Sequence, residues 1–144
     1  MKKIFLTTLI FSVVSCSVPE VPTDNLVERN GIVYQVNSDK PYSGKAIEYY
    51  ANGQAEYIET FKKGRVVQTE DYSSNGTLEY KSFWKGDVQT GTENYYENGQ
   101  LAYKASFDEN GTGFDQDYYK NGQLAYKATY KNGEVVQEES YYEN

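Results

Sequence analysis

The chain has 144 residues, enough for one domain, with 14 basic and 21 acidic residues and a net charge of −7. This acidic balance disfavours binding to nucleic acid, because the phosphates repel a negative surface. The absence of histidine and the presence of one cysteine exclude histidine-based catalytic triads and histidine metal sites, and we expect neither a cofactor nor a metal ion. The 16 tyrosines and 12 glycines indicate strands and turns rather than helices.

The amino-terminal segment, residues 1–15, has the three parts of a secretory signal. Two lysines precede an apolar run from Ile4 to Val14, and the small residue Ser15 ends the segment. The run is shorter than the ~20 residues that a membrane-spanning helix needs. We therefore predict that the protein is exported and that the mature chain begins after Ser15.

The only cysteine, Cys16, follows this segment directly. The four residues 13–16, Val-Val-Ser-Cys, resemble the bacterial lipoprotein box. The resemblance implies cleavage before Cys16 and acylation of its thiol and new amino terminus by fatty acids such as palmitate; two or three chains anchor a protein stably. An ordinary signal peptide that contains a cysteine is the alternative. We expect a lipoprotein of the bacterial cell envelope, at the outer membrane or the cell surface.

Residues 16–30 contain two of the three prolines and show no periodicity. We predict that they are a tether between the acylated Cys16 and a folded domain over residues 31–144. Without Lys2 and Lys3, the mature chain keeps 12 basic and 21 acidic residues, a net charge of −9.

Asn-Gly pairs recur every 23 residues, and the residues around them recur with the same period. The pairs are Asn52-Gly53, Asn75-Gly76, Asn98-Gly99 and Asn121-Gly122. Asn-Gly between β-prone runs is typical of a type I′ hairpin turn, in which Tyr96 would pair with Leu101. The pattern predicts an all-β fold, an elongated single antiparallel sheet of consecutive hairpins.

Alignment at this period places aromatic residues in columns that share a face of the sheet. On one face we predict a buried leucine and aromatic core, since alternate residues of the outgoing strands are apolar. Its aromatic columns are Tyr57, Tyr80, Tyr103 and Tyr126, and Phe61, Trp84, Phe107 and Tyr130. The opposite face would carry Tyr49, Tyr72, Tyr95, Tyr118 and Tyr141. This second column is a candidate binding surface, because tyrosine offers a large rigid contact area; stiffening of the sheet by packing is the alternative.

The repeated unit Tyr-Tyr-x-Asn-Gly-Gln-Leu-x-Tyr-Lys, followed by an aromatic residue and a second glycine turn, resembles the MORN-type repeat of bacterial exported proteins. The resemblance covers residues 29–144 and departs where Ser73 replaces the second tyrosine. It implies a sheet of consecutive hairpins and a role as an interaction scaffold, and some bacterial members are described as antitoxins.

The many carboxylates raise the question of catalysis. A glycosidase needs two of them across a cleft, whereas a single ribbon offers an open face. We read these residues as solubilising charge that also protects the sheet edges, and we predict no enzymatic activity. The segment 108–112 lacks the ligand spacing of a calcium loop.

The sequence is therefore compatible with two functions. The first is a membrane-anchored envelope scaffold that binds a protein partner. The second is an antitoxin or immunity protein, whose acidic surface would suit a basic toxin.

Overall fold

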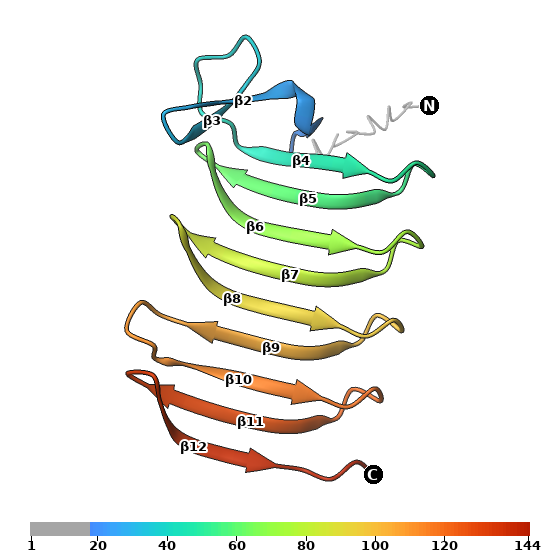
Figure 1. Ribbon diagram of the computed structural model, residues 1–144, viewed down its shortest axis with the longest axis vertical. Coiled ribbons are helices and arrows are strands. Elements are labelled where there is room, and N and C mark those ends of the chain that lie inside the picture. The colour runs from blue at the N-terminus through green and yellow to red at the C-terminus, as the bar shows by residue number, and fades with distance from the viewer. Residues whose placement is uncertain (1–17) are drawn as a thin grey trace, which may run out of the picture.

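The computed structural model describes residues 18–144, which form a long open sheet with a small cap at its amino-terminal end (Figure 1). The predicted signal over residues 1–15 and the lipidation site Cys16 lie outside the described residues. Within 18–144, no helix has the length and apolar character needed to cross a bilayer. The main sheet has ten strands in the order β1-β4-β5-β6-β7-β8-β9-β10-β11-β12.

Every neighbouring pair from β4 to β12 is antiparallel and consecutive in the chain, which confirms the predicted sheet of hairpins. The strands are β4 (Gly44–Tyr49), β5 (Ala55–Lys62), β6 (Arg65–Tyr72), β7 (Leu78–Lys85), β8 (Val88–Tyr95), β9 (Leu101–Phe107), β10 (Gly113–Tyr118), β11 (Leu124–Lys131) and β12 (Glu134–Ser140). Each repeat supplies two strands, so equivalent residues recur about every 9.6 Å along the sheet.

The Asn-Gly pairs lie in hairpin turns, but the predicted type I′ geometry is wrong. That turn needs positive φ at both central residues. Gly99 has a φ of 79°, whereas Asn98 does not have positive φ. The N–H of Gly99 donates to the carbonyl of Tyr96 at 2.8 Å, and the N–H of Tyr96 donates to the carbonyl of Gln100 at 2.8 Å. Each loop therefore has three residues and ends with a left-handed glycine.

This longer loop changes the register by one residue. Tyr95, not Tyr96, pairs with Leu101, and a bulge follows between Asn94 and Tyr95. The loop is stabilised by Asn98, whose Oδ1 accepts a hydrogen bond from the N–H of Gln100 at 3.0 Å. The same register holds in the other repeats, because Tyr49 pairs with Ala55, Tyr72 with Leu78, and Tyr118 with Leu124.

Turns with positive φ at both central residues occur at the other end of the hairpins. Lys63 and Gly64 have φ values of 54° and 76°, and Asn132 and Gly133 have values of 53° and 80°. A two-residue loop joins β5 to β6 and β11 to β12 at these sites. The type I′ turn is thus present, one half-repeat away from the predicted place.

The amino-terminal cap replaces part of the predicted tether. Residues 20–29, which we expected within the tether, form β1 (Glu20–Pro22), a 3-10 turn η1 (Thr23–Asn25) and β2 (Leu26–Arg29). Strand β1 pairs with β4 in parallel, and β2 forms a separate hairpin with β3 (Ile32–Gln35). The expectation of a tether does not hold here, because the apolar Val21 and Leu26 pack against the core.

The only continuous apolar core among the described residues lies under this cap. Tyr42, Ala46 and Phe61 are buried there, and Val33 and Val66 pack against them. Beyond the first repeat, the predicted core face has only small buried residues, among them Ala105 and Ala128. Its tyrosine column, Tyr57, Tyr80, Tyr103 and Tyr126, is half-buried, since no second layer in residues 18–144 covers the sheet beyond the cap (Figure 1).

Candidate binding surfaces

The two faces of the sheet differ in how their charges are paired. We call the face that carries Tyr49, Tyr72, Tyr95, Tyr118 and Tyr141 the ladder face, after the row of residues that crosses it. The pairing register places this row in the middle of the strands. Its members are Ile47, Ile58, Glu70, Lys81, Glu93, Lys104, Gln116, Lys127 and Glu139.

Alternating signs along this row produce three ion pairs. Lys81 lies 3.0 Å from Glu70, Lys104 lies 3.3 Å from Glu93, and Lys127 lies 3.1 Å from Glu139. The first pair is the most buried, with Glu70 side-chain exposure of 9% and Lys81 exposure of 21%. The six charged residues of this row therefore neutralise one another in pairs.

The predicted tyrosine column lies beside this row. The hydroxyl of Tyr95 donates to Glu93 at 2.6 Å, and that of Tyr118 donates to Gln116 at 3.0 Å. Burial and the bond to Glu93 raise the pKa of Tyr95 above its ordinary value. Tyr49 is the most exposed of the column, at 54%. The structure thus brings the column together on one face, and the hydroxyls of Tyr95 and Tyr118 donate hydrogen bonds to the neighbouring row.

The second tyrosine, present in every repeat except the one with Ser73, lies elsewhere in the structure. Tyr96 and its equivalents lie at the start of the turn, outside the strands, instead of joining the aromatic face by cross-strand pairing. The amide of Asn98 also donates to the carbonyl of Lys120 in the next repeat at 3.0 Å. These turn residues connect neighbouring hairpins.

The opposite face, which we call the acidic face, collects carboxylates and aromatic rings. It carries the columns of Tyr57 and Phe61 and six carboxylates, Glu48, Glu59, Asp71, Asp115, Asp117 and Glu138. The paired positions of β4–β12 on this face hold no lysine or arginine. No ion pair within residues 18–144 involves any of the six.

Burial makes several of these charges unfavourable. It raises the pKa of the Glu59 carboxyl, and the neighbouring charge of Glu48 adds to this effect. Burial likewise raises the pKa of Asp117, with Asp115 as the second cause. Two carboxylates accept tyrosine hydroxyls, since Tyr130 donates to Asp115 at 2.9 Å and Tyr126 donates to Glu138 at 3.1 Å. The acidic face thus holds negative charge that a cation would stabilise.

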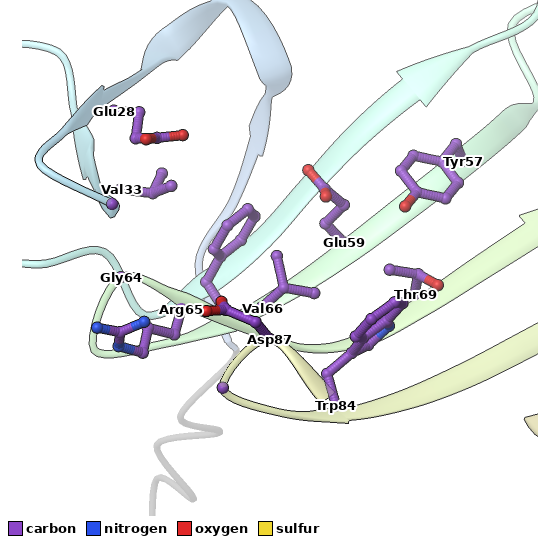
Figure 2. Close-up of a pocket in the computed structure, with 13 residues that line it drawn as sticks. Glu28, Val33, Tyr57, Glu59, Gly64, Arg65, Val66, Thr69, Trp84 and Asp87 are labelled. Atoms are coloured by element: carbon purple, nitrogen blue, oxygen red, sulfur yellow. The ribbon is translucent and has the colours of Figure 1, made fainter. Parts of the chain in front are cut away.

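A pocket of about 400 Å³ lies where the acidic face meets the cap. Figure 2 shows Tyr57, Glu59, Thr69 and Trp84 from β5, β6 and β7 on one side, with Glu28 and Val33 of the cap opposite. Trp84 is fixed by a hydrogen bond from its Nε1 to Ser82 Oγ at 2.7 Å. Ser82 Oγ lies 2.6 Å from Thr69 Oγ1. The ring of Trp84 therefore forms one wall of the pocket, which is also lined by the carboxylates of Glu28 and Glu59.

Sequence reasoning missed the ion-pair row and the pocket for different reasons. The row had a signal, because Glu70 and Glu93 are 23 residues apart, as are Lys81 and Lys104. Their pairing required the correct hairpin register. The pocket had no repeat signal, since Glu28 and Val33 come from the cap, which lies outside the 23-residue pattern.

Comparison with known proteins identifies the repeats. A model of the MORN repeat variant matches residues 42–63, 89–109 and 116–132. A search of curated proteins finds no significant match. Among solved structures, the chain is similar to one in the "Crystal structure of GtfA/B complex bound to UDP and GlcNAc", with 11% identity and a TM-score of 0.44. The similarity covers 85% of this chain and 25% of that one. The three matched segments are therefore MORN repeat variants, set in a sheet of consecutive hairpins.

Proposed function

We propose that this chain is a non-catalytic scaffold of the bacterial cell envelope that holds a basic protein partner against its acidic face. The observation that carries the proposal is the charge difference between the two faces. The ladder face pairs Lys81, Lys104 and Lys127 with glutamates, whereas the acidic face has six carboxylates without a lysine or arginine among its paired positions.

Aromatic rings on the acidic face support the same role. The half-buried Tyr80 and Tyr103 lie in a row between Asp71 and Asp117, and Asn94 separates the two rings. Such a row suits lysine and arginine side chains, which bind carboxylates and also pack against aromatic faces. The Tyr49 column of the ladder face stays a second candidate surface.

We further propose that acylated Cys16 anchors this scaffold to a membrane. Four chain steps separate Cys16 from Glu20, where β1 begins. A fully extended chain spans at most about 14 Å over that distance. The capped end of the sheet would therefore lie close to the bilayer, with β12 farther away (Figure 1). This geometry leaves the acidic face accessible to a partner beside the membrane.

The binding proposal is tested by capture of envelope proteins on matched variants. The double variant Asp71→Asn, Asp117→Asn removes two charges from the acidic face, and the control Glu97→Gln, Glu143→Gln removes two from exposed positions outside the strands. We expect a basic partner to be recovered by the wild type and the control and lost from the acidic-face variant. Equal recovery by both variants would contradict the proposal.

The anchor is tested separately in a host cell. Cys16→Ala should yield an unprocessed precursor that takes up no labelled fatty acid, because acylation requires the thiol. Normal processing of this variant would refute lipidation while leaving the binding proposal intact.

An antitoxin or immunity role is the second candidate, favoured by the same acidic face. A toxin with a basic surface, such as a nuclease, would meet complementary charge there. The two roles differ in outcome: co-expression with the captured partner should restore growth if that partner is a toxin, and should leave growth unchanged if it is an envelope component.

A further inference from the structure

The pocket under the cap differs from the rest of the acidic face because it is concave and has aromatic walls. Its volume of about 400 Å³ falls within the range of small-ligand sites, about 300–1,000 Å³. The rings of Tyr57, Phe61 and Trp84 line it, and Phe61 also packs against Tyr42 with ring centroids 5.8 Å apart. Three aromatic side chains from two strands thus line one cavity, and Figure 2 labels Tyr57 and Trp84 among them.

The charged groups of the pocket are mainly negative. Glu28, Glu59 and Asp87 line it together with a single cation, Arg65. No ion pair among residues 18–144 involves these four groups, so Arg65 does not neutralise a carboxylate of the pocket directly. Figure 2 shows Arg65 beside Gly64, at the turn between β5 and β6, and Glu59 farther along β5.

We infer that this pocket binds one lysine or arginine side chain of the protein partner, with the charged end group between Glu59 and the ring of Trp84. An ammonium or guanidinium group near an aromatic face gains a cation–π attraction, and a carboxylate adds a charge-assisted hydrogen bond. The inference rests on the proposed binding function and assigns it a specific anchor point.

The environment of Glu59 supports a cationic rather than a neutral ligand. Burial raises the pKa of this carboxyl, and the charge of Glu48 adds to the effect. A bound cation would offset both causes, whereas a neutral sugar would offset neither. The hydrogen bond from Trp84 Nε1 to Ser82 Oγ at 2.7 Å restrains the ring in the pocket wall.

The single tryptophan of the chain makes the inference directly measurable, since Trp84 lines the pocket. We would titrate the full chain carrying Cys16→Ser with Nα-acetyl-argininamide and Nα-acetyl-lysinamide and follow tryptophan fluorescence. Nα-acetyl-citrullinamide, which has a similar shape to the arginine probe without its charge, is the ligand control. Calorimetry under the same conditions detects binding that leaves the fluorescence unchanged.

We expect saturable binding of both cations and at least tenfold weaker binding of the citrulline compound. Glu59→Gln should weaken cation binding about tenfold, whereas Glu134→Gln, the same change on the exposed strand β12, should leave it unchanged. Circular dichroism verifies that both variants are folded. Equal binding of the citrulline and arginine compounds, or equal affinity in wild type and Glu59→Gln, would overturn the inference. Binding of glucose without binding of either cation would overturn it as well.

This outcome is distinguishable from failure of the binding function itself. If the wild type captures a basic partner and Glu59→Gln binds the arginine probe as well as the wild type does, only the pocket assignment fails. If the Asp71→Asn, Asp117→Asn variant captures the same proteins as the wild type but the probes bind as expected, the proposed partner binding by the wider acidic face is wrong. The assignment of the pocket is then still supported.

Discussion

The hydroxyl of Tyr96 donates a hydrogen bond of 2.6 Å to the backbone carbonyl of Tyr118 in the next repeat. Tyr50 and Tyr119 make the equivalent bonds to Tyr72 and Tyr141, each at 2.7 Å. The second repeat carries Ser73 at this position, and its short side chain bonds Asn75 and Thr77 within its own turn. Because the stability of repeat proteins depends on contacts between neighbours, this boundary lacks one stabilising link.

Ser73→Tyr should supply the missing link to the carbonyl of Tyr95. We expect the free energy of unfolding to rise by about 1 kcal/mol, the usual net value of such a bond. Ser73→Phe, which adds the ring without the hydroxyl, is the matched control and should gain less. Urea denaturation of the three proteins measures the difference. Equal stability of the tyrosine and phenylalanine variants would show that the inter-repeat bond does not form.

The ion pair between Glu70 and Lys81 predicts a second stability effect. Lys81→Met leaves the buried Glu70 carboxylate without its cation, and we expect a loss of about 3 kcal/mol. Lys104→Met is the comparison, because Lys104 is 39% exposed and Glu93 also accepts the Tyr95 hydroxyl. Its loss should stay below about 1 kcal/mol.

The double variant Glu70→Gln, Lys81→Met distinguishes two causes of instability: loss of the attraction between the charges, and burial of a carboxylate without its cation. It should recover most of the stability that Lys81→Met loses, since no charge is then buried alone. Thermal melting of the single and double variants gives the comparison. A double variant as unstable as Lys81→Met would mean that the unpaired charge of Glu70 is not the cause of the loss.

The 23-residue period was sufficient to predict the hairpin order, because one-residue slips would expose apolar side chains in every repeat. It was insufficient for the register at Asn98-Gly99. Asn-Gly occurs in two-residue loops with two left-handed residues and in three-residue loops with one. A repeat built from either loop can have the same 23-residue period. The three-residue loop contains a hydrogen bond from the N–H of Gln100 to Asn98 Oδ1, and a spacing pattern does not encode that bond.

The candidate site was predictable only in part for a related reason. Repetition identifies columns such as Tyr72 and Tyr95, but it does not tell which face remains uncovered. That depends on the cap, whose residues 20–35 pack through Val21 and Val33 and do not follow the repeat. Only with the cap in place does Glu59 become part of a pocket.

Gly113 offers a test of how closely the strands pack on the acidic face. It pairs with Phe107 on one side and Tyr130 on the other, and these two rings meet edge to face with centroids 5.3 Å apart. A Cβ at this position would collide with the carbonyl of Ser106 and lie 2.8 Å from Phe107 Cα. Gly113→Ala should therefore destabilise the protein by about 2 kcal/mol and separate the two rings.

Gly53→Ala is the control for that variant. Its Cβ would meet nothing within 4 Å, so only the cost of a left-handed alanine at φ of 86° applies, about 1 kcal/mol. Near-ultraviolet circular dichroism should change for Gly113→Ala and stay the same for Gly53→Ala. An unchanged spectrum and melting temperature for Gly113→Ala would contradict the close packing.

The bond between Tyr130 and Asp115 predicts how stability responds to alkaline pH. The hydroxyl donates to Asp115 Oδ2 at 2.9 Å, and this bond, with burial as the second cause, raises the pKa of Tyr130 to about 12. A phenol whose pKa is higher in the folded than in the unfolded state favours folding below its ordinary pKa of about 10. That contribution is complete below pH 10 and is lost as the pH rises towards 12.

Tyr130→Phe removes this titration while keeping the ring that packs on Phe107. Relative to the variant, the wild type should lose stability between pH 10 and 12, and the two should differ by a constant amount below pH 9. Denaturant unfolding at a series of pH values measures this difference. Asp115→Asn should shift the phenolate absorbance transition of Tyr130 to lower pH, because the amide does not disfavour the phenolate as a carboxylate does. If the stability difference between wild type and Tyr130→Phe stays constant up to pH 12, the bond to Asp115 does not raise the pKa of Tyr130 in the folded protein.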